Sequence, residues 1–221
     1  MKLFNLQKKQ IEKLINIIGS DYDYEIVPLL KTTNSKPLQC FSNVENKVAL
    51  CGGAIYYGWS VHFGSYIIEA ERHAVWQDED ENLFCITPHP SNKTEVIFIP
   101  DNRKVEFSDQ IDNVRLNNSG LKIVDDWINI CENINLLYNR FTKRVDDEQV
   151  IVPTEVGKVI NIMENYRSLL YNLIKQKESD KVKCFCEKGI NDKRKYFDCH
   201  SKKIKEDFKT YLDELENLAK I

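Results

Sequence analysis

Four metal-binding side chains fall within one short segment near the carboxyl end of this chain of 221 residues. Cys184 and Cys186 are one residue apart, and Cys199 is followed directly by His200. The residues between the two pairs are mostly polar and turn-forming, so the segment has little apolar surface to bury. Three thiolates and one imidazole complete the tetrahedral shell of a structural zinc site and leave no open position for a substrate. The sequence therefore predicts a tail that folds around Zn²⁺.

The spacing of these ligands resembles the SEC-C motif, the small zinc module of the SecA tail. In this chain the spacer between the two ligand pairs is longer than in that motif and lacks its Gly-Ser-Gly. The alternative is three incidental buried cysteines beside a surface histidine, which the absence of an apolar element around them disfavours. The resemblance implies four zinc ligands, Cys184, Cys186, Cys199 and His200, and a spacer that carries Gly189, Lys193, Lys195 and Tyr196.

The composition is that of a protein with a real hydrophobic core, since 42% of the residues are hydrophobic. No apolar run is long enough for a membrane span, and the amino terminus has no signal-peptide pattern, so we expect a cytoplasmic protein without membrane contact. Seven cysteines without the spacing of a disulfide framework agree with a reducing compartment. A net charge of −3 argues against broad nucleic-acid binding, although lysines around the zinc ligands make a local contact with an acidic partner conceivable.

The hydrophobic periodicity predicts an α+β fold. Apolar residues recur at helical spacing over 4–18 and 40–50, which indicates two early helices. Alternating, β-branched and aromatic runs then predict an antiparallel sheet, most simply a meander, with strands at 54–63, 66–76, 83–87 and 96–99. After Gly120 the pattern is helical to the end, at 123–145, 154–177 and 203–219.

Three regions follow from this pattern. Residues 1–120 are expected to form an α+β body in which helices lead into an antiparallel sheet. Residues 121–180 are expected to form a helical hairpin packed on that body. Residues 181–221 contain the zinc module and a terminal helix.

Cys40 is the first candidate for chemistry in the body. It is placed at the start of the helix expected over 40–50, where unpaired amides and the helix dipole lower the pKa of a thiol and favour the nucleophilic thiolate. The alternative is that Cys40 is a small buried hydrophobe on the inner face of its helix.

His73 is the second candidate. Strand alternation places it on the same face as Glu69 and Glu71, so two carboxylates and an imidazole share one side of a strand. A Glu-x-Glu-x-His strand is also a possible second metal site, although no fourth ligand is apparent nearby. His62 alternates with small residues on its own strand, and we expect it to be exposed to solvent.

The order of a cysteine at a helix start and then a histidine on a strand resembles the papain-like and transglutaminase-like cysteine enzymes. The resemblance implies that Cys40 is the nucleophile and His73 the general base. The position of the third catalytic group holds Cys85 or Thr87, so Glu71, or alternatively Glu69, is the candidate to orient the imidazole if the twist of the strand brings it to His73. The body also resembles that of small bacterial proteins that carry a SEC-C tail, a resemblance that brings no activity with it.

Two functions from different classes are consistent with these patterns. The first is a cysteine-dependent acyl-transfer enzyme, an amidase, peptidase or transglutaminase-like protein, in which Cys40 attacks a carbonyl and His73 carries the proton. The second is a non-catalytic adaptor that binds a protein or peptide through the α+β body while the zinc tail contacts a further partner, as SEC-C modules do in protein export and at ribosomes.

Overall fold

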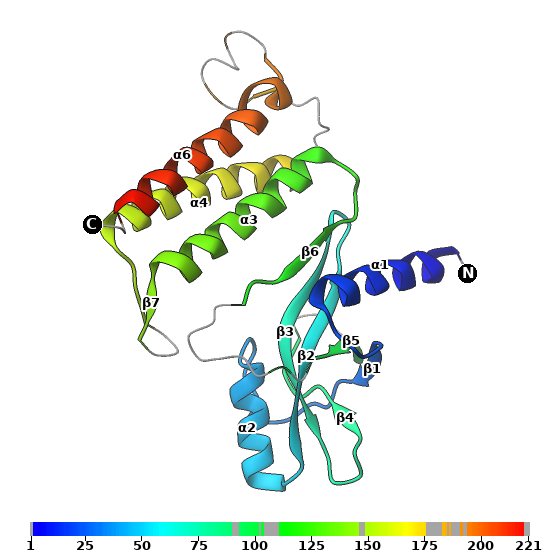
Figure 1. Ribbon diagram of the computed structural model, residues 1–221. Helices are drawn as coiled ribbons and strands as arrows, with labels where there is room; N and C mark the ends of the chain where they lie inside the picture. Colours follow the sequence, from blue (N-terminus) through cyan, green and yellow to red (C-terminus); the bar gives the residue numbers. More distant parts are fainter. Residues whose placement is uncertain are drawn as a thin grey trace. The chain divides into compact units, whose positions relative to one another are not determined.

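The computed structural model shows a chain divided into two compact units (Figure 1). The first unit contains Met1–Val105 and Asp112–Leu116, and the second contains Glu106–Ile111 and Asn117–Ile221. Helices and an antiparallel sheet are both present, so the predicted α+β class is confirmed. The structure describes residues 2–89, 93–101, 103, 111–145, 149–175, 183–184, 186, 191 and 194–218.

The first unit is built on a six-stranded antiparallel sheet. Strands β2 and β3 are its longest pair and run in register from Ala54 opposite Gln77 to Phe63 opposite Ile68. The sheet is not the simple meander that the sequence suggested, because β5 pairs with β2 and β1 instead of following β4. The strands are β1 (Glu25–Pro28), β2 (Ala54–Phe63), β3 (Ile67–Gln77), β4 (Leu83–Phe84), β5 (Glu95–Pro100) and β6 (Val114–Asn117), the last paired with β3.

The sheet closes on itself into a small barrel. Its path runs β1-β5-β2-β3-β4, and a parallel bridge between Leu29 and Cys85 joins the two ends. Two backbone hydrogen bonds form this closure, from Leu30 N to Cys85 O at 2.8 Å and from Cys85 N to Pro28 O at 2.9 Å. Strand β4 is only two residues long, so its pairing with β3 ends at Phe84 and the next residue, Cys85, pairs with Leu29 after β1. Closure gives β1 and β4, the two ends of the path, a second neighbour at this point.

The barrel interior holds a cluster of five buried apolar side chains, among which Phe98 and Val75 are fully buried. Gly58 is needed beside it, because a Cβ atom there would lie 2.4 Å from the Phe98 ring and 2.3 Å from the carbonyl oxygen of Ile99. The complete cluster is Val27, Val75, Cys85, Val96 and Phe98.

Two helices cover the outer face of the barrel. Helix α1 (Lys2–Ile18) packs Leu14 against Trp59 and Ile68, whereas α2 (Cys40–Cys51) packs Val44 against Ala74. These partners are odd-numbered residues of β2 and even-numbered residues of β3, which the pairing register places on one face. Alternation along the strands therefore separates a helix-covered face from the barrel interior.

The second unit is helical, with α3 (Lys122–Phe141), α4 (Thr154–Lys175) and α6 (Lys202–Leu218). The sequence placed the end of the first helix at 145, but it ends at Phe141 because Thr142 takes an extended conformation and its hydroxyl donates to the Tyr138 carbonyl at 2.7 Å. The chain then forms a short hairpin, β7 (Lys143–Arg144) with β8 (Val150–Ile151). In the described residues, no helix is both long and apolar enough to span a membrane.

The first unit extends beyond the segment 1–105 only by residues 112–116, and helices α3, α4 and α6 belong to the second unit. Strand β6 was not expected from the sequence, which left residues 101–119 unassigned. The expected regions 1–120, 121–180 and 181–221, and the packing of the helical hairpin on the body, stay predictions.

Candidate functional site

The two ligand pairs in the tail are brought together by a local backbone pairing. Lys183 forms an antiparallel bridge with Lys195, and the amide of Cys184 donates to the Arg194 carbonyl at 2.8 Å. This pairing returns the chain to Cys184 just before the second ligand pair. Cys199 and His200 lie in a π-helical turn, η1 (Phe197–Ser201), which leads directly into α6. Single π-helical turns of this kind often occur at functional sites.

The ligand atoms of the four residues converge, all within 4.8 Å of one another. Cys186 Sγ lies 3.6 Å from both Cys184 Sγ and Cys199 Sγ. His200 Nδ1 lies 2.9 Å from Cys184 Sγ and 3.4 Å from Cys199 Sγ. Zinc–sulfur bonds of about 2.3 Å at tetrahedral angles place two sulfur ligands about 3.8 Å apart. The cluster therefore has the dimensions of a first coordination shell.

The cluster is closed on one side and partly open on the other. Cys184 and His200 are buried, with exposed fractions of 1% and 8%, whereas Cys186 and Cys199 are half-buried. Burial lowers the pKa of His200, which favours the neutral imidazole that a metal requires. Burial raises the pKa of the Cys184 thiol to about 12 in the absence of a cation. A bound metal reverses this preference, because a coordinating thiol gives up its proton.

Asp126 of α3 is part of the surroundings of this cluster, and it was not among the residues predicted from the sequence. Its carboxylate is buried, with 5% exposed, and it accepts hydrogen bonds from Tyr196 and Ser201. A signal was present in the sequence: Asp126 occurs between Ile123 and Ile130 at helical spacing, on the face that packs inward. An acidic residue at a core position of an amphipathic helix indicates a buried polar partner.

His73 lies on β3, in agreement with the strand expected over 66–76, but its partner is a different cysteine from the one predicted. Its Nε2 atom is 3.3 Å from Cys85 Sγ, and the ring is buried with 9% exposed. Burial lowers the pKa of His73 to about 4 and raises the pKa of Cys85 to about 11. At neutral pH both groups are therefore uncharged, and the thiol is not activated by its neighbour.

Cys40 begins α2, as the sequence predicted, but the predicted low pKa is wrong. Burial is the largest influence and raises the pKa of the thiol, which outweighs the hydrogen bonds from the backbone of Ala74 and Phe41. Within the described part of the chain, no hydrogen bond joins Cys40 to His73. The thiol is buried with 9% exposed, as expected for the small-hydrophobe alternative.

Glu69 and Glu71 share the face of His73, as the alternation predicted, but they do not converge on it. Their positions on β3 are opposite His62 and Ser60 of β2. Glu69 Oε1 accepts from Arg115 Nε at 2.8 Å, and Glu71 Oε2 lies 3.7 Å from His62 Nε2.

His62 was expected to be exposed to solvent, but it is half-buried. Besides its contact with Glu71, its ring stacks on that of His89, with centroids 5.4 Å apart. Burial lowers the pKa of both rings. Among the residues that the structure describes, the Cys/His cluster in the tail is the only group of three or more ligands that could hold a metal. The Glu-x-Glu-x-His alternative is thus not supported.

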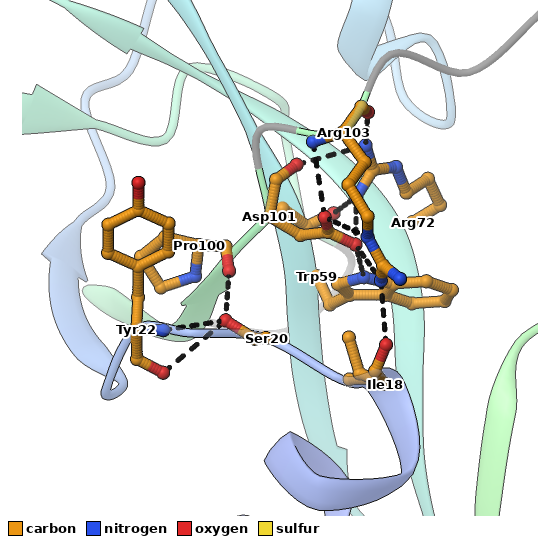
Figure 2. A network of polar contacts seen from close by, with 9 residues as sticks. Ile18, Ser20, Tyr22, Trp59, Arg72, Pro100, Asp101 and Arg103 are labelled. Carbon is orange, nitrogen blue, oxygen red and sulfur yellow. Dashed lines mark hydrogen bonds and ion pairs between the residues drawn. The ribbon is translucent and has the colours of Figure 1, made fainter.

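A third polar cluster holds the barrel to α1 (Figure 2). Asp101 accepts from Trp59 Nε1 at 2.9 Å and pairs with Arg72 at 3.0 Å and Arg103 at 2.7 Å. Arg103 also donates to the Ile18 carbonyl at the end of α1, at 2.6 Å. Burial alone would raise the pKa of Asp101, but the hydrogen bonds from Arg103 and Trp59 and the charge of Arg72 together lower it to about 2. Asp101 is the shared partner of both guanidinium groups, so the network joins the residue after β5 to β3 and to the end of α1.

Comparison with known proteins gives no relative from which to transfer a function. No family model matches the chain, and neither the curated proteins nor the solved structures contain a match. The resemblances to SEC-C modules and to cysteine enzymes therefore stay predictions from the sequence.

Proposed function

We propose that Cys184, Cys186, Cys199 and His200 hold one Zn²⁺ ion as a structural centre, in a protein that acts as a non-catalytic adaptor. The convergence of the four ligand atoms within 4.8 Å supports this proposal most strongly. Three sulfur ligands and one imidazole nitrogen are a donor set that zinc prefers, and four protein ligands leave no place for a substrate. The resemblance to the SEC-C motif points to the same metal.

The role of the ion is to fold the tail. Among the described residues next to the ligands, Tyr196 is a fully buried aromatic side chain, while Lys183, Arg194 and Lys195 are exposed or lie in the backbone pairing. A segment with so little apolar surface gains its stability from metal binding, which in small zinc modules is the folding free energy itself. We therefore expect the metal-free tail to be unfolded.

The adaptor function is favoured over the acyl-transfer function by the state of the thiols in the barrel. An acyl-transfer enzyme needs a thiolate beside a base, whereas burial raises the pKa of Cys40 and His73 lies against Cys85. Glu71 lies by His62 and so does not orient the predicted base. Recognition of a protein partner stays a proposal that rests on the resemblance of the tail to SEC-C modules.

Metal analysis of the purified full chain tests the proposed centre. We expect one equivalent of zinc in the parent protein, and cobalt reconstitution should give the thiolate-to-cobalt absorption of a tetrahedral site. Cys199→Ser should lose the metal. Cys51→Ser is the matched control, because Cys51 is an exposed thiol at the end of α2, and it should keep a full equivalent. Protein that contains no metal under reducing purification and binds none on titration would contradict the proposal.

A further inference from the structure

One buried carboxylate joins the tail to the helices of the second unit. Asp126 of α3 accepts from Tyr196 Oη at 3.1 Å and from Ser201 Oγ at 2.5 Å, both through Oδ2. Its Oδ1 atom lies 2.8 Å from Lys205 Nζ. Both carboxylate oxygens are thus occupied by donors from one continuous segment of the tail.

These donors flank the second ligand pair. Tyr196 comes before Cys199 in the chain, and Ser201 directly follows His200. Lys205 is one helical turn further, in the first part of α6. Because Asp126 holds the chain on both sides of Cys199 and His200, it limits how that ligand pair can move or rotate.

We propose that Asp126 is a positioning residue for the metal centre: it holds Cys199 and His200 in the arrangement that completes the metal shell. The proposal rests on the proposed zinc centre and adds a residue that is distant from the ligands in sequence. Side chains that orient metal ligands without touching the ion typically contribute 10-fold to 100-fold to metal affinity. Asp126 does so through the backbone of η1, by way of Ser201 and Tyr196.

Through these contacts, metal binding and the packing of the tail on Asp126 strengthen each other. The two hydrogen bonds and the ion pair with Lys205 are lost when the tail detaches, so they favour the state in which the tail is packed on α3. If Asp126 strengthens metal binding by a given factor, the metal strengthens the contacts of Asp126 by the same factor. Metal occupancy is thereby linked to the packing of the tail on α3.

The test measures the zinc affinity of the full chain by competition with a chromophoric chelator. Asp126→Asn, which keeps the shape but removes the charge, should weaken binding by about 10-fold to 100-fold. Asp125→Asn is the matched control, because Asp125 is the next residue on α3, is exposed, and accepts from Asn117 Nδ2 away from the ligands. The zinc affinity of this variant should stay within about twofold of that of the parent.

Two milder variants keep the proposal testable if Asp126→Asn does not fold. Tyr196→Phe and Ser201→Ala each remove one hydroxyl donor to the carboxylate. Each should weaken zinc binding in the same direction, and each should alter the cobalt absorption spectrum, which reports the geometry of the ligands and not the stability of the helices. In a double variant with Asp126→Asn, Tyr196→Phe or Ser201→Ala should weaken zinc binding by less than it does alone, because Asp126→Asn has already weakened the same contact.

The outcomes separate this proposal from the proposed function. A parent protein that binds no metal would overturn both. A parent protein that binds zinc, together with an Asp126→Asn variant of unchanged affinity and unchanged cobalt spectrum, would overturn the positioning role and leave the metal centre intact. If Asp126→Asn fails to fold, unchanged affinity in both Tyr196→Phe and Ser201→Ala would overturn the positioning role equally.

Discussion

The barrel and the tail each place a histidine ring against a cysteine sulfur, yet the two sites have different chemistry. In the barrel, His73 Nε2 lies 3.3 Å from Cys85 Sγ. In the tail, His200 Nδ1 lies 2.9 Å from Cys184 Sγ, and two further thiols complete the group. The barrel pair lies in a strand-built apolar interior, whereas the tail cluster lies between a short backbone pairing and a π-helical turn.

The two sites differ in the number of possible metal ligands and in the polarity of the residues around them. A thiol and an imidazole alone cannot satisfy a tetrahedral ion, and apolar neighbours such as Phe98 favour the neutral forms of both groups. Four convergent ligands can offset the cost of burying charge, because the cation neutralises the thiolates. The identity of the residues is therefore not sufficient to assign a site, and their convergence decides it.

The largest expected effect is the loss of metal from one site and not from the other. Cys184→Ser should reduce the bound zinc from one equivalent to almost none and unfold the tail, since a structural zinc contributes about 10 kcal/mol or more. Cys85→Ser should leave the zinc content unchanged and lower only the stability of the barrel. Metal analysis and thermal unfolding of both variants measure this, and zinc lost equally from both would remove the distinction between the sites.

A second contrast concerns how tightly each unit is packed. Gly58→Ala should destabilise the barrel by about 3 kcal/mol, because the new methyl group meets the Phe98 ring and the backbone of Ile99. Gly157→Ala in α4 is the matched change in the second unit. Its Cβ would meet only Val152 Cγ1 at 3.7 Å, so the variant should gain about 0.5–1 kcal/mol from helix propensity.

Chemical denaturation with probes in each unit measures both glycine effects. Trp59 and Trp76 report on the first unit, and Trp127 reports on the second. Equal effects of the two substitutions would show that the Gly58 backbone can move away from Phe98 at little cost.

A third effect is the acid sensitivity of the first unit. Asp101 has a pKa of about 2 in the folded protein, below its ordinary value of 3.8, so it binds fewer protons folded than unfolded at intermediate pH. Its contribution of about 2 kcal/mol is therefore complete above about pH 5 and is lost as the pH falls toward 2. Unfolding free energies of the parent and of Asp101→Asn over this range should converge at low pH. A constant difference between them would contradict the assigned pKa.

The smallest effect is expected in thiol reactivity. Mass spectrometry after brief alkylation at pH 7 should show exposed Cys51 modified at least about tenfold faster than buried Cys40 and Cys85. His73→Ala should leave the rate at Cys40 unchanged in a variant that remains folded. If Cys40 instead reacts faster than Cys51 and slows in His73→Ala, the acyl-transfer hypothesis regains its support and a substrate search follows.

The helices and the candidate metal ligands could be predicted from local sequence, and several long-range contacts could not. The helix expected over 40–50 is Cys40–Cys51, and the one expected over 154–177 is Thr154–Lys175, because each has a continuous apolar stripe. The bridge between Leu29 and Cys85 has no local signal, so barrel closure was missed. For the same reason the sequence paired His73 with Cys40 instead of Cys85.

The amino-acid sequence by itself determined the class of the fold and the set of candidate metal ligands. Both depend on short-range information: the period of apolar residues, and ligand types repeated within one segment. Tertiary structure alone decided which thiol meets His73, which hydroxyl groups donate to Asp126, and how Arg103, paired with Asp101, holds the end of α1 to the barrel. The physical reason is that a pKa or a buried hydrogen bond depends on groups far apart in the chain, which only the folded backbone brings into contact.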